Sequence, residues 1–415
     1  MAVGAFGKRR MRVGRYWVIK PYEAFGNRAE ELYFALLKCR RDRLCLVIVK
    51  RKWDLFGKVR FRSANKELLN IRHPLIADHP ALEVVNYLIT LLLSVLRIPG
   101  IAIRRSRSLL GFQPKSNCLV ELSNKVFGQA GLWGNVCAPF DVRNLAIDWE
   151  RELGEKVNAQ YRSRGELDRE FPALANKKYV CLHVRTGGFF KDYECSAPRN
   201  ATINNYILAL RELTRLGYVV VRIGDPAMPP LIMDGVLDYA HSRSKSEKND
   251  VLLIEHCEFF IGSLSGPIDT ACLFEKRILT VNCLSLAHCT WYRMGSLMVP
   301  KKVVLRRRAL SLKEQIDLHL FEICGTGQMV EGVEYRENSA AEILEAVREF
   351  QTFSELSERQ MVFNRYLRDK MLEYFHATRV WGNAEDDASQ KTRWASRIFF
   401  AKGSICAGYL KDNWQ

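Results

Sequence analysis

A histidine and an arginine close a strongly apolar run near the middle of the chain, and two carboxylic acids follow them. Residues 179–182 are typical of a buried strand, and His183 and Arg185 come at its end. A guanidinium stays charged at any working pH and binds phosphate or carboxylate through two parallel hydrogen bonds. Asp192 and Glu194 lie just beyond, where a carboxylate could take a proton from a hydroxyl group. The spacing predicts an anion site with Arg185, Asp192 and Glu194 as candidate catalytic residues.

Each of these residues also has an ordinary structural interpretation. A single arginine at a strand end often forms a salt bridge, and a histidine one residue from the end often makes a simple hydrogen bond. We favour phosphate binding for Arg185 because a second polar group is expected near it, at the end of a neighbouring strand.

That second group is a serine-rich turn between an apolar run and a helix. Ser263 and Ser265 leave the apolar run, and Gly266 and Pro267 begin the helix. Proline is favoured in a first helical turn, where its missing N–H is not needed. Free N–H groups at a helix start, with two hydroxyl groups beside them, suit a phosphate. An ordinary N-cap is an equally good interpretation, and the glycine spacing excludes both a Walker loop and a G-x-G-x-x-G turn.

Further polar residues follow two other apolar runs. Arg222 and Asp225 end one run, and Asp238, Tyr239 and His241 follow the next. Asp225 could orient a ribose or cap the following turn, and Asp238 could act as a base or pair with an arginine. The sequence does not choose among these acids.

The elements that must position these residues alternate between strands and helices. Strands are predicted at 178–185, 218–225, 235–240, 258–263 and 277–282, with helices at 200–217 and 246–257 and another from 265. This alternation predicts a parallel, doubly wound sheet. Ligands of such sheets bind at the carboxyl ends of the strands, where all the polar residues above fall.

The N-terminal half contains a similar unit. A strand at 16–20, a helix within 21–39 and a buried strand at 44–49 predict a βαβ unit, with Gly26, Asn27 and Arg28 at the start of its crossover. A polar helix is predicted at 148–165, and a C-terminal helix at 339–351 begins after an N-cap at Ser339.

The fold class predicted from this pattern is α/β, with two Rossmann-like lobes and a helical C-terminal segment. The expected domains are an N-terminal lobe on the acceptor side, a C-terminal ligand-binding lobe and terminal helices that pack on the lobes, at 1–165, 166–330 and 331–415.

Composition limits the partners. The chain of 415 residues has a formal net charge of +17, and its first 60 residues hold 16 Lys and Arg against five Asp and Glu. An anionic partner is therefore expected: a phosphorylated substrate, a membrane surface or a nucleic acid. We disfavour nucleic acid because no helix-turn-helix, zinc finger or RNP-type strand is recognisable. Segment 81–103 is too interrupted for a membrane span, so it predicts a buried helix or, as an alternative, an interfacial one.

Metal binding and disulfides are not expected. The 12 cysteines include no C-x-x-C pair, which favours buried, reduced thiols in a cytosolic protein. No signal peptide is recognisable at the N-terminus. No D-x-D pair occurs in the chain, so a metal-bound diphosphate of the carboxylate type is disfavoured and no cofactor is expected.

Several spaced motifs together resemble a family of bacterial glycosyltransferases of surface polysaccharide synthesis. These motifs are His-Val-Arg at 183–185, GYVVVRIGD at 217–225, DYAHS at 238–242, FFIGSLSG at 259–266 and ENSAAEILEAV at 337–347. That family is in turn similar to the two-lobed (GT-B) fucosyltransferases, and a related plan occurs in β-Kdo transferases that use a CMP-linked donor. The resemblance covers most of residues 15 to 350.

The resemblance implies a nucleotide-sugar donor held without a metal. It places the donor diphosphate at His183 and Arg185, and a phosphate loop at Ser263, Ser265 and Gly266. It also implies that Asp225 and Tyr239 lie near the nucleoside or donor sugar, and that Gly26, Asn27 and Arg28 form a cleft-side turn in the N-terminal lobe. Arg222 and His241 are expected as further donor contacts from their place at the strand ends.

The chain departs from the pattern in two places. Thr186, Gly187 and Gly188 stand where the family often has an acid, so the catalytic carboxylate is expected at Asp192 or Glu194. The long basic N-terminus lies beyond the pattern and suggests docking to a lipid-linked acceptor at the inner face of the cell membrane.

The leading hypothesis from the sequence is a glycosyltransferase that moves a sugar from a nucleotide-activated donor to a surface-polysaccharide or lipid-linked glycan acceptor. The alternatives are a nucleic-acid-binding protein, which the net charge favours, and a non-catalytic scaffold associated with the membrane.

Overall fold

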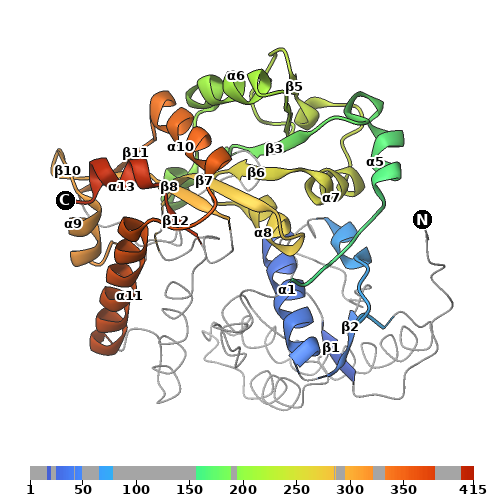
Figure 1. Ribbon diagram of the computed structural model, residues 1–415, viewed down its shortest axis with the longest axis horizontal. Helices are drawn as coiled ribbons and strands as arrows, with labels where there is room; N and C mark the ends of the chain where they lie inside the picture. The colour runs from blue at the N-terminus through green and yellow to red at the C-terminus, as the bar shows by residue number, and fades with distance from the viewer. Residues whose placement is uncertain are drawn as a thin grey trace, which may run out of the picture. The chain divides into compact units, whose positions relative to one another are not determined.

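The structure is a computed structural model in which the chain divides into two compact units, Met1–Leu145 and Ala146–Gln415 (Figure 1). It describes residues 16–19, 25–41, 43–48, 65–77, 156–187, 194–284, 286, 295–320, 332–378 and 403–415. Segment 81–103, predicted as a buried or interfacial helix, lies outside these residues. Among the residues described, no helix is both long enough and apolar enough to cross a membrane.

The first unit contains the predicted βαβ arrangement. Strands β1 (Tyr16–Ile19) and β2 (Cys45–Ile48) pair in parallel, and helix α1 (Phe25–Arg41) connects them. Leu32 and Leu36, four residues apart, are both buried because they lie on one face of α1. A short 3-10 helix, η1 (Lys66–Asn70), packs against α1.

The second unit is built on a parallel sheet of seven strands, as the alternation of strands and helices predicted. The strand order is β12-β8-β7-β6-β3-β4-β5, and every described pair in it is parallel. The bounds are β3 (Tyr179–His183), β4 (Val219–Arg222), β5 (Val236–Leu237), β6 (Phe259–Gly262), β7 (Arg277–Cys283), β8 (Leu297–Pro300) and β12 (Ser404–Ile405). The sequence predicted five of these strands; β8 and β12 extend the sheet at one edge.

Helices cover both faces of this sheet (Figure 1). Helices α6 (Ile207–Arg215) and α10 (Ala340–Thr352) lie together on one face, and α7 (Glu247–His256) and α8 (Gly266–Leu273) lie on the other. Side chains alternate along β3 accordingly. Val180 and Leu182 join the core beneath α6 and α10, whereas the Tyr179 hydroxyl donates a hydrogen bond to the Leu253 carbonyl of α7 at 2.8 Å. A strand buried on both faces explains the unbroken apolar run in the sequence.

The C-terminal segment belongs to the same unit. Helix α10 begins after a capping box formed by Ser339 and Glu342, as the N-cap pattern predicted. Helices α11 (Glu358–Thr378) and α13 (Ala407–Asn413) pack against each other, and β12 pairs with β8. Not all of this segment is helical, because β11 (Val333–Arg336) joins β9 (Lys302–Leu305) and β10 (Arg308–Ala309) in a small antiparallel sheet beside α9 (Leu312–Asp317).

The polar helix predicted at 148–165 is wrong over residues 156–163. Residues 156–162 are not helical, and α5 (Arg164–Glu170) begins only after the N-cap Ser163. The reason is tertiary: the Glu255 carboxylate accepts hydrogen bonds from the backbone N–H groups of Tyr161 at 2.6 Å and Arg162 at 2.9 Å. These bonds replace the ones that a helix would supply, so contacts with α7 override the local helix propensity.

Candidate functional site

The candidate site lies at the point where the winding of the sheet reverses. Strands β3 and β6 are hydrogen-bonded neighbours, yet they belong to separate strand–helix units of the chain. The chain runs from β3 to α6 on one face of the sheet, and from β6 to α8 on the other. Two neighbouring strands whose helices leave to opposite faces define the topological switch point, where open parallel sheets bind ligands at the carboxyl ends. His183 and Ser263 come at those two ends.

The ends of β3 and β6 are tied together by backbone and side-chain hydrogen bonds. The Ser263 N–H donates to the His183 carbonyl at 3.1 Å, and the Arg185 N–H donates to the Ser263 hydroxyl at 2.8 Å. Gly262 permits this close approach, because a Cβ there would lie 2.7 Å from the His183 carbonyl oxygen. Ser263 is fully buried, so its hydroxyl fixes the backbone of Arg185 and is not open to a ligand.

His183 is joined to the second serine of the turn. Its Nδ1 lies 2.8 Å from the Ser265 hydroxyl, which also lies 3.0 Å from the Ser263 carbonyl. A carbonyl only accepts, and a hydroxyl has one proton to give. Satisfying both contacts therefore requires Ser265 to donate to Ser263 and His183 Nδ1–H to donate to Ser265. In this arrangement Nε2 of His183 carries a lone pair, so it can accept a hydrogen bond from a ligand hydroxyl.

The environment of His183 keeps its ring neutral. Burial is the largest cause and lowers the pKa of His183 from 6.5 to about 3, with the positive charges of Arg185, Lys245 and Arg222 acting in the same direction. A neutral ring adds no charge to the site, so the positive charge beside it belongs to Arg185.

Arg185 is buried and held by the segment that follows the switch point. Its Nη1 donates to Oδ1 of Asn200, and its carbonyl accepts from the Ala201 N–H at 3.0 Å. Arg185 and Asn200 thus form one hydrogen-bonded unit at the carboxyl edge of β3. Nearby, Arg199 Nη2 donates to the Leu264 carbonyl at 3.2 Å and so ties this segment to the serine-rich turn.

The turn into α8 is not an ordinary side-chain cap. Ser265 is the N-cap residue of α8, but its hydroxyl makes no capping bond and is engaged by His183 and Ser263 instead. Gly266 and Pro267 open the helix, and the first intrahelical contact is from the Ile268 N–H to the Ser265 carbonyl at 3.0 Å. The Ser265 hydroxyl therefore does not accept from an N–H group of the first turn, as the side chain of an ordinary serine N-cap does.

The predicted residues after β4 and β5 form a separate, mutually bonded cluster. Arg222 is 1% exposed and donates from Nη1 to the Pro229 carbonyl at 2.7 Å and to Asp238 at 3.3 Å. Asp238 also accepts from the Leu231 N–H, and its Oδ2 lies 2.8 Å from Nδ1 of His241. These bonds hold the loop between β4 and β5, so the structure brings Arg222 and His241 together around Asp238 and not at the switch point.

Two more predicted donor contacts have structural partners. The Asp225 carboxylate accepts from the Ala227 N–H at 2.8 Å and so caps a turn. Tyr239 is fully buried, and its hydroxyl donates to the Ser246 carbonyl at 3.1 Å.

The predicted catalytic acids and the N-terminal turn are described only in part. Asp192 lies outside the described residues, and Glu194 is the first residue of a 3-10 helix, η4 (Glu194–Arg199). Gly26, Asn27 and Arg28 lie within α1 of the first unit, where Arg28 Nη1 donates to the Asn65 carbonyl at 2.6 Å. Within the described ranges no group of three or more His, Cys, Asp or Glu side chains is arranged to hold a metal ion.

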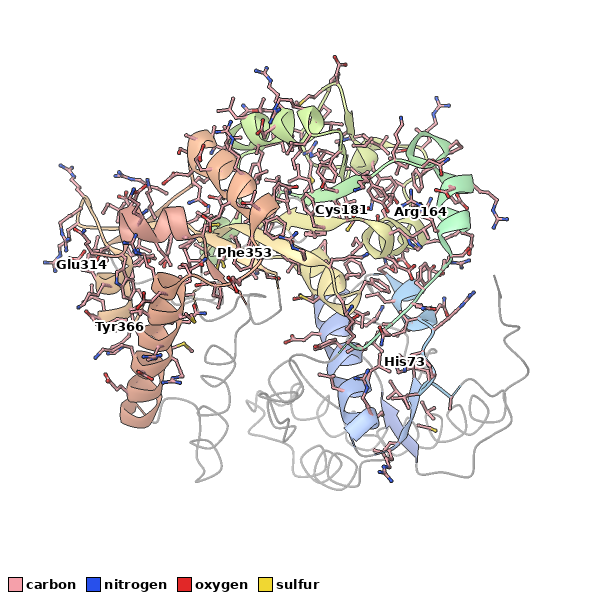
Figure 2. The ribbon with its side chains drawn as sticks, in the orientation of Figure 1. His73, Arg164, Cys181, Glu314, Phe353 and Tyr366 are labelled. Atoms are coloured by element: carbon pink, nitrogen blue, oxygen red, sulfur yellow. The ribbon has the colours of Figure 1, made fainter. Side chains whose placement is uncertain are left out.

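Lys301 is a residue of this edge that sequence reasoning did not identify. It follows β8, is 4% exposed, and its Nζ donates to the Asn200 carbonyl at 2.6 Å. Figure 2 shows the side chains of the described residues and labels Cys181, which lies on β3. The only sequence signal was a lysine directly after the apolar run Leu297–Pro300, which was not recognised as a strand of the sheet.

Comparisons with known proteins add little to this geometry. No protein family and no curated protein matches the sequence. Among solved structures, the chain is similar to the E. coli ADP-heptose lps heptosyltransferase II, with a TM-score of 0.35 and 13% identity over 64% of this chain and 84% of that one. The chain is also similar to the glycosyl transferase family 9 structure from Veillonella parvula DSM 2008, with a TM-score of 0.42 and 11% identity over 81% of this chain and 97% of that one. TM-scores this low do not establish a shared fold. The candidate site is therefore assigned from the contacts within this chain alone.

Proposed function

We propose that this chain is a glycosyltransferase that binds a nucleotide-activated sugar at the switch point between β3 and β6. The observation that carries the proposal is the position of the His183–Ser265 contact and of buried Arg185 at that point. An anionic ligand suits the site because it has a guanidinium, a helix start without a side-chain cap and a neutral histidine that adds no pH-dependent charge. The diphosphate of a nucleotide sugar meets these requirements.

The proposed reaction transfers the sugar to a glycan hydroxyl without a bound metal. Leaving-group charge would then be stabilised by Arg185 and the N–H groups at the start of α8. Asp192 or Glu194 would take the proton from the acceptor hydroxyl, because both follow Arg185 closely in the chain. A two-lobed GT-B arrangement, with the first unit on the acceptor side, completes the proposal. Activity that persists in EDTA would support the absence of a metal, and activity restored only by a divalent cation would contradict it.

The proposed acceptor is a surface polysaccharide or lipid-linked glycan at the inner face of the cell membrane. The excess of basic residues in the first 60 positions supports this location, since anionic lipid attracts clusters of Lys and Arg. Co-sedimentation with vesicles of anionic and of neutral lipid tests it. Equal sedimentation with the two would count against an electrostatic membrane contact.

The first experiment is a thermal-shift screen of the full chain against UDP, GDP, ADP, CMP and their sugars, followed by donor hydrolysis and transfer assays. One nucleotide class should raise the melting temperature, because a ligand that binds only the folded state stabilises it. The proposal is refuted if no nucleotide or nucleotide sugar of the panel raises the melting temperature and no nucleotide sugar is hydrolysed or transferred.

Arg185→Ala tests the role of the guanidinium. We expect nucleotide affinity to fall by about tenfold or more, since hydrogen bonds to charged groups are worth roughly 1.5–3 kcal/mol. Arg211→Ala is the matched control, because Arg211 is an exposed arginine on α6 and should leave the affinity unchanged. A large fall in the melting temperature of Arg185→Ala with unchanged nucleotide affinity would assign Arg185 to folding alone.

A further inference from the structure

Lys301 is a buried ammonium group that forms no ion pair with any residue that the structure describes. It is 4% exposed, and in the part of the chain that the structure describes its side chain makes one hydrogen bond, to the Asn200 carbonyl. An ammonium group has three donors, so this bond leaves donor capacity for a further acceptor. Burial lowers the pKa of Lys301, and Glu337 opposes that shift. Both Glu337 carboxylate oxygens are already bonded, to Thr202 and Asn205.

Lys301 and Arg185 meet at the same residue. Arg185 Nη1 donates to the side chain of Asn200, and Lys301 Nζ donates to its carbonyl. Two buried cations therefore contact the same residue, at the carboxyl edge that carries the His183–Ser265 contact. Because no carboxylate forms an ion pair with Lys301 in the described residues, an anion beside its ammonium group would stabilise this arrangement.

The backbone around Lys301 is fixed by two buried asparagines. Asn282 and Asn338 exchange backbone-to-side-chain hydrogen bonds of 2.9 and 2.7 Å, and Asn338 Nδ2 donates to the Pro300 carbonyl at 2.8 Å. The Lys301 N–H donates to the Cys283 carbonyl at the end of β7, also at 2.8 Å. This network holds the lysine at the end of β8 before any ligand arrives, which is how a preorganised binding residue is supported.

We propose that Lys301 is a phosphate-binding residue and that, with Arg185, it forms a two-cation site on Asn200 for the diphosphate of the donor. The inference rests on the proposed function and narrows the class of donor: it favours nucleoside diphosphate sugars and disfavours nucleoside monophosphate sugars. Each cation serves one phosphate group, and Asn200 fixes the separation between them.

Inorganic pyrophosphate is the probe, because it tests the cation pair without a nucleobase. Isothermal titration calorimetry with Lys301→Met should show a loss of about tenfold or more in pyrophosphate affinity. Lys301→Arg keeps the charge and should recover most of that loss. Lys302→Met is the matched control: the neighbouring lysine is half-exposed and pairs with Glu342 at 2.7 Å, so its removal should leave the affinity unchanged.

A ligand series separates a phosphate contact from a structural role. Lys301→Met should weaken the nucleoside diphosphate that the wild type binds, and leave the matching nucleoside unchanged. Equal losses for nucleoside and diphosphate, or unchanged pyrophosphate affinity, would overturn the inference. Labelling of lysines in the wild-type protein with acetic anhydride needs no variant: pyrophosphate should protect Lys301 and not Lys302, and equal labelling with and without pyrophosphate would also overturn it.

The outcomes for this inference and for the proposed function are distinct. Pyrophosphate binding that depends on Lys301, with no nucleotide sugar bound or transferred, would retain the two-cation site and refute the glycosyltransferase. Transfer from a nucleotide sugar that Lys301→Met leaves unchanged would retain the glycosyltransferase and refute the role of Lys301.

Discussion

Because the folded protein keeps His183 neutral, its free energy of unfolding should fall in acid, and replacing His183 should remove this part of the fall. The folded pKa of His183 is about 3, whereas its ordinary value is 6.5. Because the folded pKa is the lower one, protonation favours the unfolded chain. The contribution of His183 to stability is therefore complete above pH 6.5 and is lost as the pH falls from 6.5 toward 3.

The size of this loss follows from the pKa difference. At about pH 4.5 the unfolded histidine is protonated and the folded one is not, and two units below the unfolded pKa correspond to about 2.7 kcal/mol. The loss at about pH 7.5 is less than about 0.1 kcal/mol by the same relation. His183 alone should thus lower the free energy of unfolding by about 2.5 kcal/mol between these two pH values.

Urea unfolding of the wild type and of His183→Asn at the two pH values measures this contribution. Asparagine has no charged form and keeps an amide donor near the position of Nδ1, toward Ser265. We expect the wild type to lose about 2.5 kcal/mol more than the variant on acidification. Parallel losses in the two proteins would show that His183 is not held neutral, and would refute the lone pair assigned to its Nε2.

Two further predictions concern the packing and the charges around the site. Gly262→Ala should lower the free energy of unfolding by about 1–3 kcal/mol, because the added Cβ would press on the His183 carbonyl. Gly165→Ala in α5, where a Cβ meets only the Ser163 hydroxyl at 4.0 Å, should raise it by up to about 1 kcal/mol. Urea midpoints of the two variants that move in the same direction would contradict this. Asp238→Asn should cost about 3–5 kcal/mol by leaving buried Arg222 without its carboxylate, and should not change nucleotide affinity. A selective loss of affinity in Asp238→Asn would place this cluster in the donor site.

Local pattern was enough to predict β3 and β6, the strands that position His183 and Ser263. Apolar runs without alternation predicted β3, β6 and β7 because these strands are buried on both faces of the sheet. The N-cap at Ser339 predicted the start of α10, since a capping box is a local signal.

Contacts between distant segments were beyond such patterns. Residues 156–162 have a helical composition, but carboxylates of Glu255 and Glu275 bind their backbone N–H groups, from about a hundred positions away along the chain. Lys301 was missed for a similar reason: its neighbour Asn200 is 101 residues distant in sequence. Neither the partner nor the burial of such a residue is encoded in its surroundings along the chain.

The two His–Arg pairs of the sheet show what decides between structure and function at a strand end. His183 ends β3 and Arg185 follows it, whereas Arg222 ends β4 and His241 follows β5; the sequence placed all four at strand ends where an anion could bind, and favoured Arg185. Arg222 and His241 share the carboxylate of Asp238, so the chain itself supplies the anion that they bind. His183 instead bonds a serine hydroxyl and stays neutral, and the buried Lys301 after β8 donates to a carbonyl and forms no ion pair with a carboxylate within the described ranges. An anionic ligand stabilises a buried cation that has no ion pair, and this difference supports our proposal of an anion site at the ends of β3 and β6.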